Sequence, residues 1–108
     1  MMSNFSESEA EKITAVLTDL AEFRRNTGAR VAEWEKKGGK NEGSELVILL
    51  AAVLTEADGL SRLIDSIVDG TEESVPVEDL RERVVGLKLR AGILIGRWKA
   101  FRAQGIER

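Results

Sequence analysis

The stretch VEDLRERVVGLKLRAGILIGRWKAF, residues 77–101, decides the fold that we expect. Its apolar residues recur at alternating spacings of three and four from Val77 to Phe101. This spacing keeps side chains on one face of an α-helix and is typical of coiled coils. At about 100° per residue, a second apolar set lies well away from the first; it consists of Val85, Leu89 and Ile93. The stretch therefore predicts a long helix with two apolar faces, one for its own core and one for a partner.

The composition of the chain favours a folded helical domain. Its 108 residues have room for a single modest core. Hydrophobic residues at 43% and charged residues at 32% are typical of a folded rather than a disordered chain. A single proline and 5% aromatic residues favour helices over a small β-sandwich.

The residue types that are missing restrict the chemistry. The sequence holds no cysteine and no histidine. These absences exclude a disulfide framework, a thiolate zinc site, a cysteine nucleophile and a histidine acid/base pair. We therefore assign no catalytic residue, no metal ligand and no cofactor, and the sequence favours a non-enzymatic role.

Neither a signal peptide nor a membrane span is indicated. The opening segment, residues 1–11, is polar and acidic. The longest apolar run, residues 46–54, is nine residues long, whereas a membrane helix needs about 20. We expect a cytoplasmic protein without membrane contact, with which the lack of cysteine is compatible.

Two further helices are predicted before residue 77. Ser6 and Glu9 have the S-x-x-E form of a capping box, which predicts the start of a first helix over about 7–37. Gly28 is the point at which this helix would kink, because glycine is a poor helix former. The glycine-rich segment 38–43 follows and predicts a loop.

Turn and cap residues predict where the other two helices begin and end. Ser44 can cap a second helix over about 45–69, and Gly70 provides its C-terminal signal. A third helix is expected over about 76–104, with Pro76 in its first turn. The sequence thus predicts an all-α fold, an antiparallel three-helix bundle of long helices in a single domain, residues 1–108.

Several apolar residues exceed what a three-helix core can cover. The first half of the second helix is apolar on every side, which is typical of an enclosed helix. Gly92 and Gly96 have the small-xxx-small spacing that lets helix backbones approach closely. We therefore predict a homodimer whose interface consists of Val47, Ile48, Leu54, Val85, Leu89, Gly92, Ile93 and Gly96.

Charge is segregated along the chain. Residues 24–40 hold six bases against two acids, and residues 80–108 hold eight against two, whereas residues 41–79 hold ten acids and one base. In an antiparallel bundle the ends of the first and third helices meet, which predicts a basic pole opposite an acidic one. We assign to the basic pole Arg24, Arg25, Arg30, Lys36, Lys37, Lys40, Arg97, Lys99 and Arg102.

Acidic residues suggest one enzymatic alternative. Glu42 and Glu45 form an E-x-x-E spacing, followed on one flank of the second helix by Asp58, Asp65 and Asp69. This spacing resembles the all-helical nucleotide pyrophosphohydrolases of the MazG type, and the resemblance implies Mg²⁺ held by carboxylates between helices. The second acidic motif of that family, E-x-x-D, does not follow at the expected place.

The sequence therefore favours a small protein–protein interaction module, acting as a regulator, an adaptor or an assembly factor. Its partner would be a second copy of the chain or another protein, recognised through a helix face. The first alternative is nucleic-acid or phosphate-ligand binding through the basic pole. The second is a MazG-like metal-dependent pyrophosphohydrolase.

Overall fold

The computed structural model of the chain describes residues 7–37, 42–72 and 75–106. In these segments the chain forms three α-helices and no strand, which confirms the expected all-helical fold. The helices are α1 (Glu7–Lys37), α2 (Glu42–Asp69) and α3 (Val77–Ile106). All three pairs of helices are in contact, so the three helices share one core.

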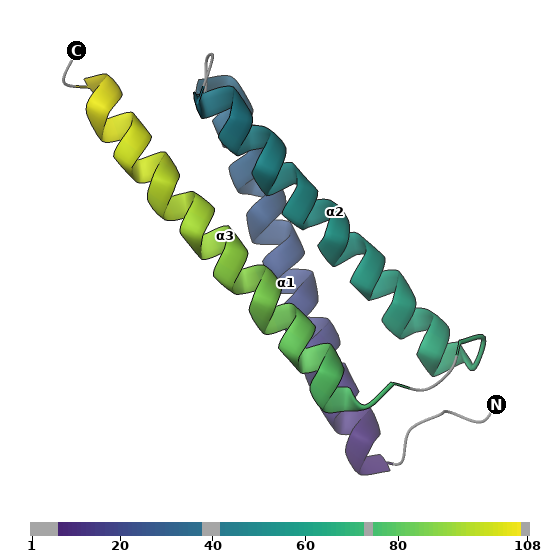
Figure 1. The fold of residues 1–108 in the computed structure, drawn as a ribbon. Helices are drawn as coiled ribbons and strands as arrows, with labels where there is room; N and C mark the ends of the chain where they lie inside the picture. The colour runs from purple at the N-terminus through teal and green to yellow at the C-terminus, as the bar shows by residue number, and fades with distance from the viewer. Residues whose placement is uncertain (1–6, 38–41, 73–74, 107–108) are drawn as a thin grey trace.

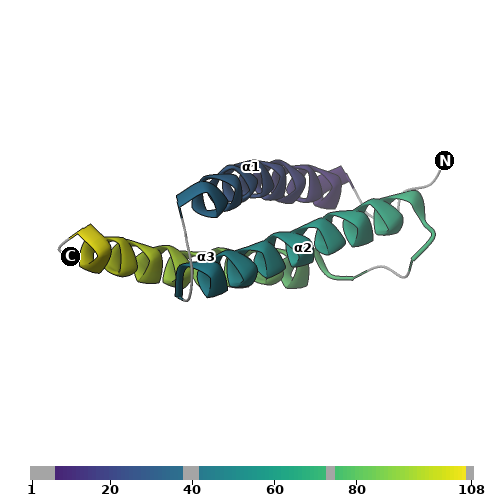
Figure 2. The same ribbon diagram turned by 90° about the horizontal axis from the view of Figure 1, so that it is seen from above.

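The helices lie side by side in an elongated body of 59 × 19 × 17 Å (Figure 1). Seen from above, α1 lies on one side of the pair formed by α2 and α3 (Figure 2). This arrangement leaves the opposite side of α2 and α3 uncovered by α1.

The core consists of one stripe from each helix. Ile13, Val16 and Leu20 begin the α1 stripe, which ends at Trp34. The apolar side chains that recur every three or four residues along residues 77–98 of α3 are also buried. They are Val77, Leu80, Val84, Leu87, Ala91, Leu94 and Trp98. The predicted core face of the third helix is therefore confirmed.

Two tryptophans join α1 to α3 near the ends of these helices. The rings of Trp34 and Trp98 stack with centroids 4.4 Å apart and planes 6° apart. Phe101 packs against Trp98 at 5.6 Å. Both tryptophans are buried, so their large apolar surfaces stabilise the core at this end.

Helix α1 runs through Gly28 without interruption. A Cβ atom at this position would lie 3.9 Å from Leu54 Cδ2, so the Leu54 side chain covers the glycine at ordinary van der Waals distance. Thr27 beside it is buried in the core stripe. Packing against α2 therefore outweighs the low helix propensity of glycine here.

The boundaries of α2 and α3 differ slightly from the expected ones. Helix α2 begins at Glu42 rather than at residue 45, so Ser44 lies inside its first turn and does not cap it. Gly43 is buried in this turn, and glycine is well accepted near helix N-termini. The rest of the predicted loop, residues 38–41, lies outside the described segments.

Helix α3 begins at Val77, one residue later than expected, because Pro76 occupies the N-cap position. The Pro76 carbonyl accepts hydrogen bonds from the backbone N–H groups of Asp79 at 3.0 Å and Leu80 at 3.4 Å. Proline has no N–H to lose at this position, so it starts a helix without leaving a donor unpaired.

Gly70 ends α2 in a Schellman motif. Its N–H group donates to the carbonyl of Ile67 at 3.1 Å, and the N–H of Thr71 donates to that of Ser66 at 2.9 Å. The Thr71 hydroxyl donates to the same Ser66 carbonyl at 3.1 Å. Gly70 has a φ of 83°, a left-handed conformation that costs glycine least.

The same substitution should have opposite effects at Gly59, inside α2, and at Gly70, directly after its last residue. Gly70→Ala should destabilise the fold by about 1 kcal/mol, because alanine is strained at positive φ. Gly59→Ala should stabilise it by up to about 1 kcal/mol, since a Cβ atom there meets nothing within 4 Å. Urea unfolding followed by circular dichroism measures both; equal effects at the two sites would contradict this account.

Candidate interaction surface

The outer face of α3 carries a ridge of exposed apolar side chains. Val85 is 54% exposed, and Leu89 and Ile93 are each 65% exposed. Residues four apart lie one above the other on a helix, so the three side chains form one continuous ridge. We call Val85, Leu89 and Ile93 the outer strip.

Three glycines accompany the outer strip, and none of them is required by packing inside the chain. A Cβ atom at Gly86, Gly92 or Gly96 would meet nothing within 4 Å. Each glycine inside a helix costs about 1 kcal/mol relative to alanine. Within the described segments, therefore, no contact offsets this cost. The glycines leave the backbone of α3 accessible beside the strip.

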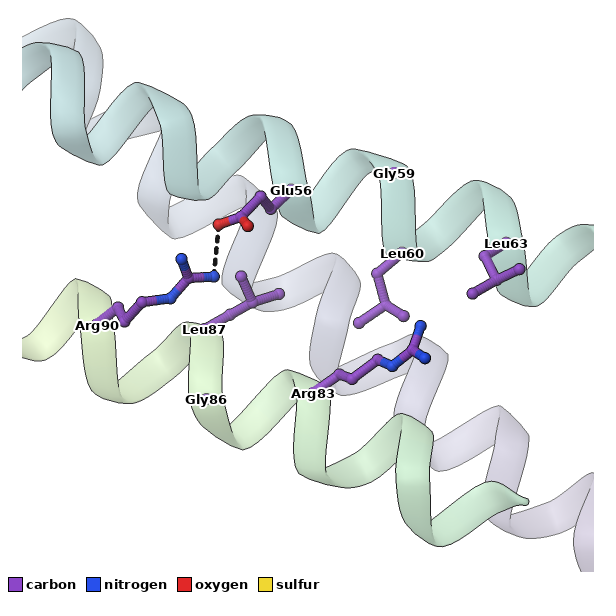
Figure 3. Close-up of a pocket in the computed structure, with 8 residues that line it drawn as sticks. All are labelled: Glu56, Gly59, Leu60, Leu63, Arg83, Gly86, Leu87 and Arg90. Atoms are coloured by element: carbon purple, nitrogen blue, oxygen red, sulfur yellow. Dashed lines mark ion pairs between the residues drawn. The ribbon is translucent and has the colours of Figure 1, made fainter. Parts of the chain in front are cut away.

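An apolar groove follows the seam between α2 and α3 (Figure 3). It has a volume of about 500 Å³ and includes Gly59 on one helix and Gly86 on the other. Glu56 and Arg90 form an ion pair of 2.5 Å across it. The other residues that line it are Leu60, Leu63, Arg83 and Leu87.

The groove continues toward the outer strip. Beyond Glu56 and Arg90 lies a second hollow of about 260 Å³, lined by Leu49, Ala52 and Ile93 among others. Ile93 therefore belongs both to the strip and to the groove wall. The sequence does not predict this groove, because its walls come from two helices that are distant in sequence.

The structure divides the predicted interface residues of α2 into two groups. Ile48 is 66% exposed and lies one turn before Ala52. Val47 is half-buried against the core, and Leu54 is half-buried and lies over Gly28 of α1. Val47 and Leu54 therefore contribute mainly to packing within the chain, whereas Ile48 resembles the outer strip in its exposure.

The predicted basic pole is only partly assembled. The Arg102 Nη1 group donates to the Lys37 carbonyl at 3.1 Å, which brings the ends of α1 and α3 together. Arg24 and Arg25 lie 13 and 12 residues before Lys37, or about 20 Å along the helix. They are therefore not at the pole, while Lys40 lies outside the described segments. Arg25, Arg30, Lys36, Lys37, Arg97 and Lys99 are exposed.

Arg24 is instead engaged halfway along the body. Its Nε atom lies 2.6 Å from Asp58 Oδ1, and its Nη1 group donates to Ser61 at 3.3 Å. On the other side of α1, Lys88 pairs with Asp19 at 2.5 Å. These ion pairs are roughly half-exposed, so each contributes little to stability but helps to fix how the helices face each other.

The acidic side chains of α2 that the structure describes do not gather into a metal site, and the Glu42 side chain is not among them. Asp58 is used by Arg24. Across the described parts of the chain, no three acidic side chains come close enough together to hold a metal ion. Nor does any helix in these parts have the length and apolarity needed to cross a membrane.

No family model matches this chain, and no significant match was found among curated proteins or solved structures. Functional inference therefore depends on the geometry of the surface itself.

Proposed function

We propose that this chain is a small helical protein–protein interaction module, and that its first partner is a second copy of itself. The observation that carries the proposal is the outer strip, three large apolar side chains that are more than half exposed on one ridge of α3. Contiguous exposed apolar surface on a folded chain is typical of a site that binds another protein.

The size of the strip is consistent with dimerisation. Burying a large apolar side chain completely contributes about 1.5–3 kcal/mol, so covering the exposed part of each strip residue contributes roughly 1–2 kcal/mol. Two copies together provide six such side chains, or roughly 6–12 kcal/mol. Association costs about 4–15 kcal/mol, so a stable dimer also needs contacts from Ile48 and the groove.

We also propose an antiparallel up-down-up order for the three helices, and the order of their contacts supports it. Arg24 contacts Asp58, whereas Gly28, further along α1, lies against the earlier Leu54. The wall of the α2–α3 groove includes Leu63 with Arg83, and its continuation includes Leu49 with Ile93. In both helix pairs, contacts further along one helix are made by residues earlier in the other, as in antiparallel helices.

In this proposal the module works in the cytoplasm as a regulator, an adaptor or an assembly factor. Apolar contact on the outer strip provides affinity, as at the core of most interfaces. The charged ends provide orientation and speed of association rather than strength. A second protein with an apolar helix face could occupy the same strip once the dimer dissociates.

Leu89→Lys should dissociate the dimer. The substitution removes apolar contact from both copies and places two like charges at the interface, so the dissociation constant should rise at least about 100-fold, or about 2.8 kcal/mol. Sedimentation equilibrium measures this constant. Ala29→Lys, at an exposed site on α1, is the control and should leave it unchanged. A wild-type chain that remains monomeric at the highest protein concentration measured would refute the homodimer.

Larger side chains in place of the glycines beside the outer strip should also dissociate the dimer. Gly92→Leu together with Gly96→Leu should yield a helical monomer, because the added side chains keep a second helix away, while a Cβ atom at either position meets nothing within 4 Å in the described part of the chain. Ala29→Leu together with Ala32→Leu adds similar apolar surface at exposed sites of α1, away from the strip and the groove, and should leave the dimer intact. Light scattering gives the mass and circular dichroism the helicity; an oligomeric double variant would contradict the role of these glycines.

A further inference from the structure

The outer strip and two of its three glycines, Gly86 and Gly92, are arranged symmetrically about Leu89. Val85 lies four residues before Leu89, and Ile93 lies four residues after it. Gly86 lies three residues before, and Gly92 three residues after. Suppose that the α3 helices of two copies cross at Leu89 and run in opposite directions. A residue that precedes Leu89 in one copy then lies level with the residue that follows Leu89 by the same number of positions in the other copy. Large residues then meet large residues, and glycine lies level with glycine.

The charges of α3 change sign about the same centre: acids lie before Leu89, and bases dominate after it. All the acids of α3 precede Leu89; they are Glu78, Asp79 and Glu82. From Arg83 to Ile106 the helix holds six bases and no acid. The two bases beyond the strip on its outer side are Arg97 and Lys99, which follow Leu89 by eight and ten residues.

The distances of these bases and of the acids from Leu89 agree to within one residue. The acids lie eleven, ten and seven residues before Leu89. In two helices that run in opposite directions, the bases of one copy are therefore level with the acids of the other, at both ends of the contact. In helices that run in the same direction, each base would face its own counterpart, and like charges repel.

The charges concerned are available for a partner. In the segments that the structure describes, four of these charged residues are exposed and form no ion pair: Arg97, Lys99, Asp79 and Glu82. Glu78 has only a surface pair of 3.1 Å with Arg81, three residues away on the same helix. Such exposed pairs exchange readily. The open backbone at the three glycines would also allow the two helices to approach closely.

We infer that two copies of the chain pair through α3 in opposite directions, with Leu89 of each copy at the two-fold axis. Val85 of one copy then packs against Ile93 of the other, and the bases at 97 and 99 lie beside the acids at 78, 79 and 82. This inference rests on the proposed function, to which it adds the direction and register of the contact. Such a contact is isologous and closed, so it stops at two copies.

Single cysteines test the register, because the chain has no cysteine of its own. Leu89→Cys should form a disulfide-linked dimer on mild oxidation, since residues at a two-fold axis can reach the Cα–Cα distance of about 4.4–6.8 Å that a disulfide needs. Val85→Cys and Ile93→Cys should each remain unlinked alone but link to each other when mixed. Ala29→Cys on α1 measures random collision.

The outcomes separate the register from the proposed function. Self-linking of both Val85→Cys and Ile93→Cys faster than the α1 control would show helices that run in the same direction, and would overturn the inference. If the chain sediments as a dimer but Leu89→Cys links no faster than the α1 control, the register is wrong and the proposed interaction module still stands. A monomeric wild-type chain would overturn both the register and the homodimer.

Charge exchange tests the electrostatic match independently. Arg97→Glu with Lys99→Glu makes one variant, and Glu78→Lys with Asp79→Lys and Glu82→Lys makes the other. Each alone should dimerise at least tenfold more weakly than the wild type, because like charges meet at both ends. An equimolar mixture should form a heterodimer close to wild-type strength. A mixture as weak as its separate components would overturn the proposed pairing.

Discussion

Each helix of a three-helix bundle can turn only one face to the common core, and this constraint governs the molecule. In α3 the core face is complete from Val77 to Trp98. The residues at 85, 89 and 93 lie on the far side of the same helix and cannot reach that core by any rotation that keeps the first face buried. Their exposure is thus a consequence of the fold that the rest of the chain adopts.

The two kinds of contact in the molecule have different roles. Apolar packing, including the stack of Trp34 on Trp98, provides the free energy that holds the helices together. The half-exposed ion pairs, such as Arg24 with Asp58, contribute little energy and instead distinguish one arrangement from another. The same division applies to the proposed dimer, where the strip provides affinity and the charges choose direction.

Much of the fold could be predicted, because helix periodicity and cap residues act locally. The stop at Gly70 and the continuous core stripe of α3 are examples. The placement of Val47 and Leu54 could not be predicted in this way, because it depends on which side of α2 faces α1. The groove through Gly59 and Gly86 is likewise formed by two helices that are distant in sequence.

The amino-acid sequence by itself determined three helices, their core faces and a surplus apolar face on the last of them. These properties depend on residues a few positions apart, whose relative directions a helix fixes. Only the tertiary structure decided that Arg24 serves an ion pair halfway along the body rather than a basic pole. It also decided that Gly86, Gly92 and Gly96 border open space. Such facts depend on how whole helices pack, and no local spacing contains that information.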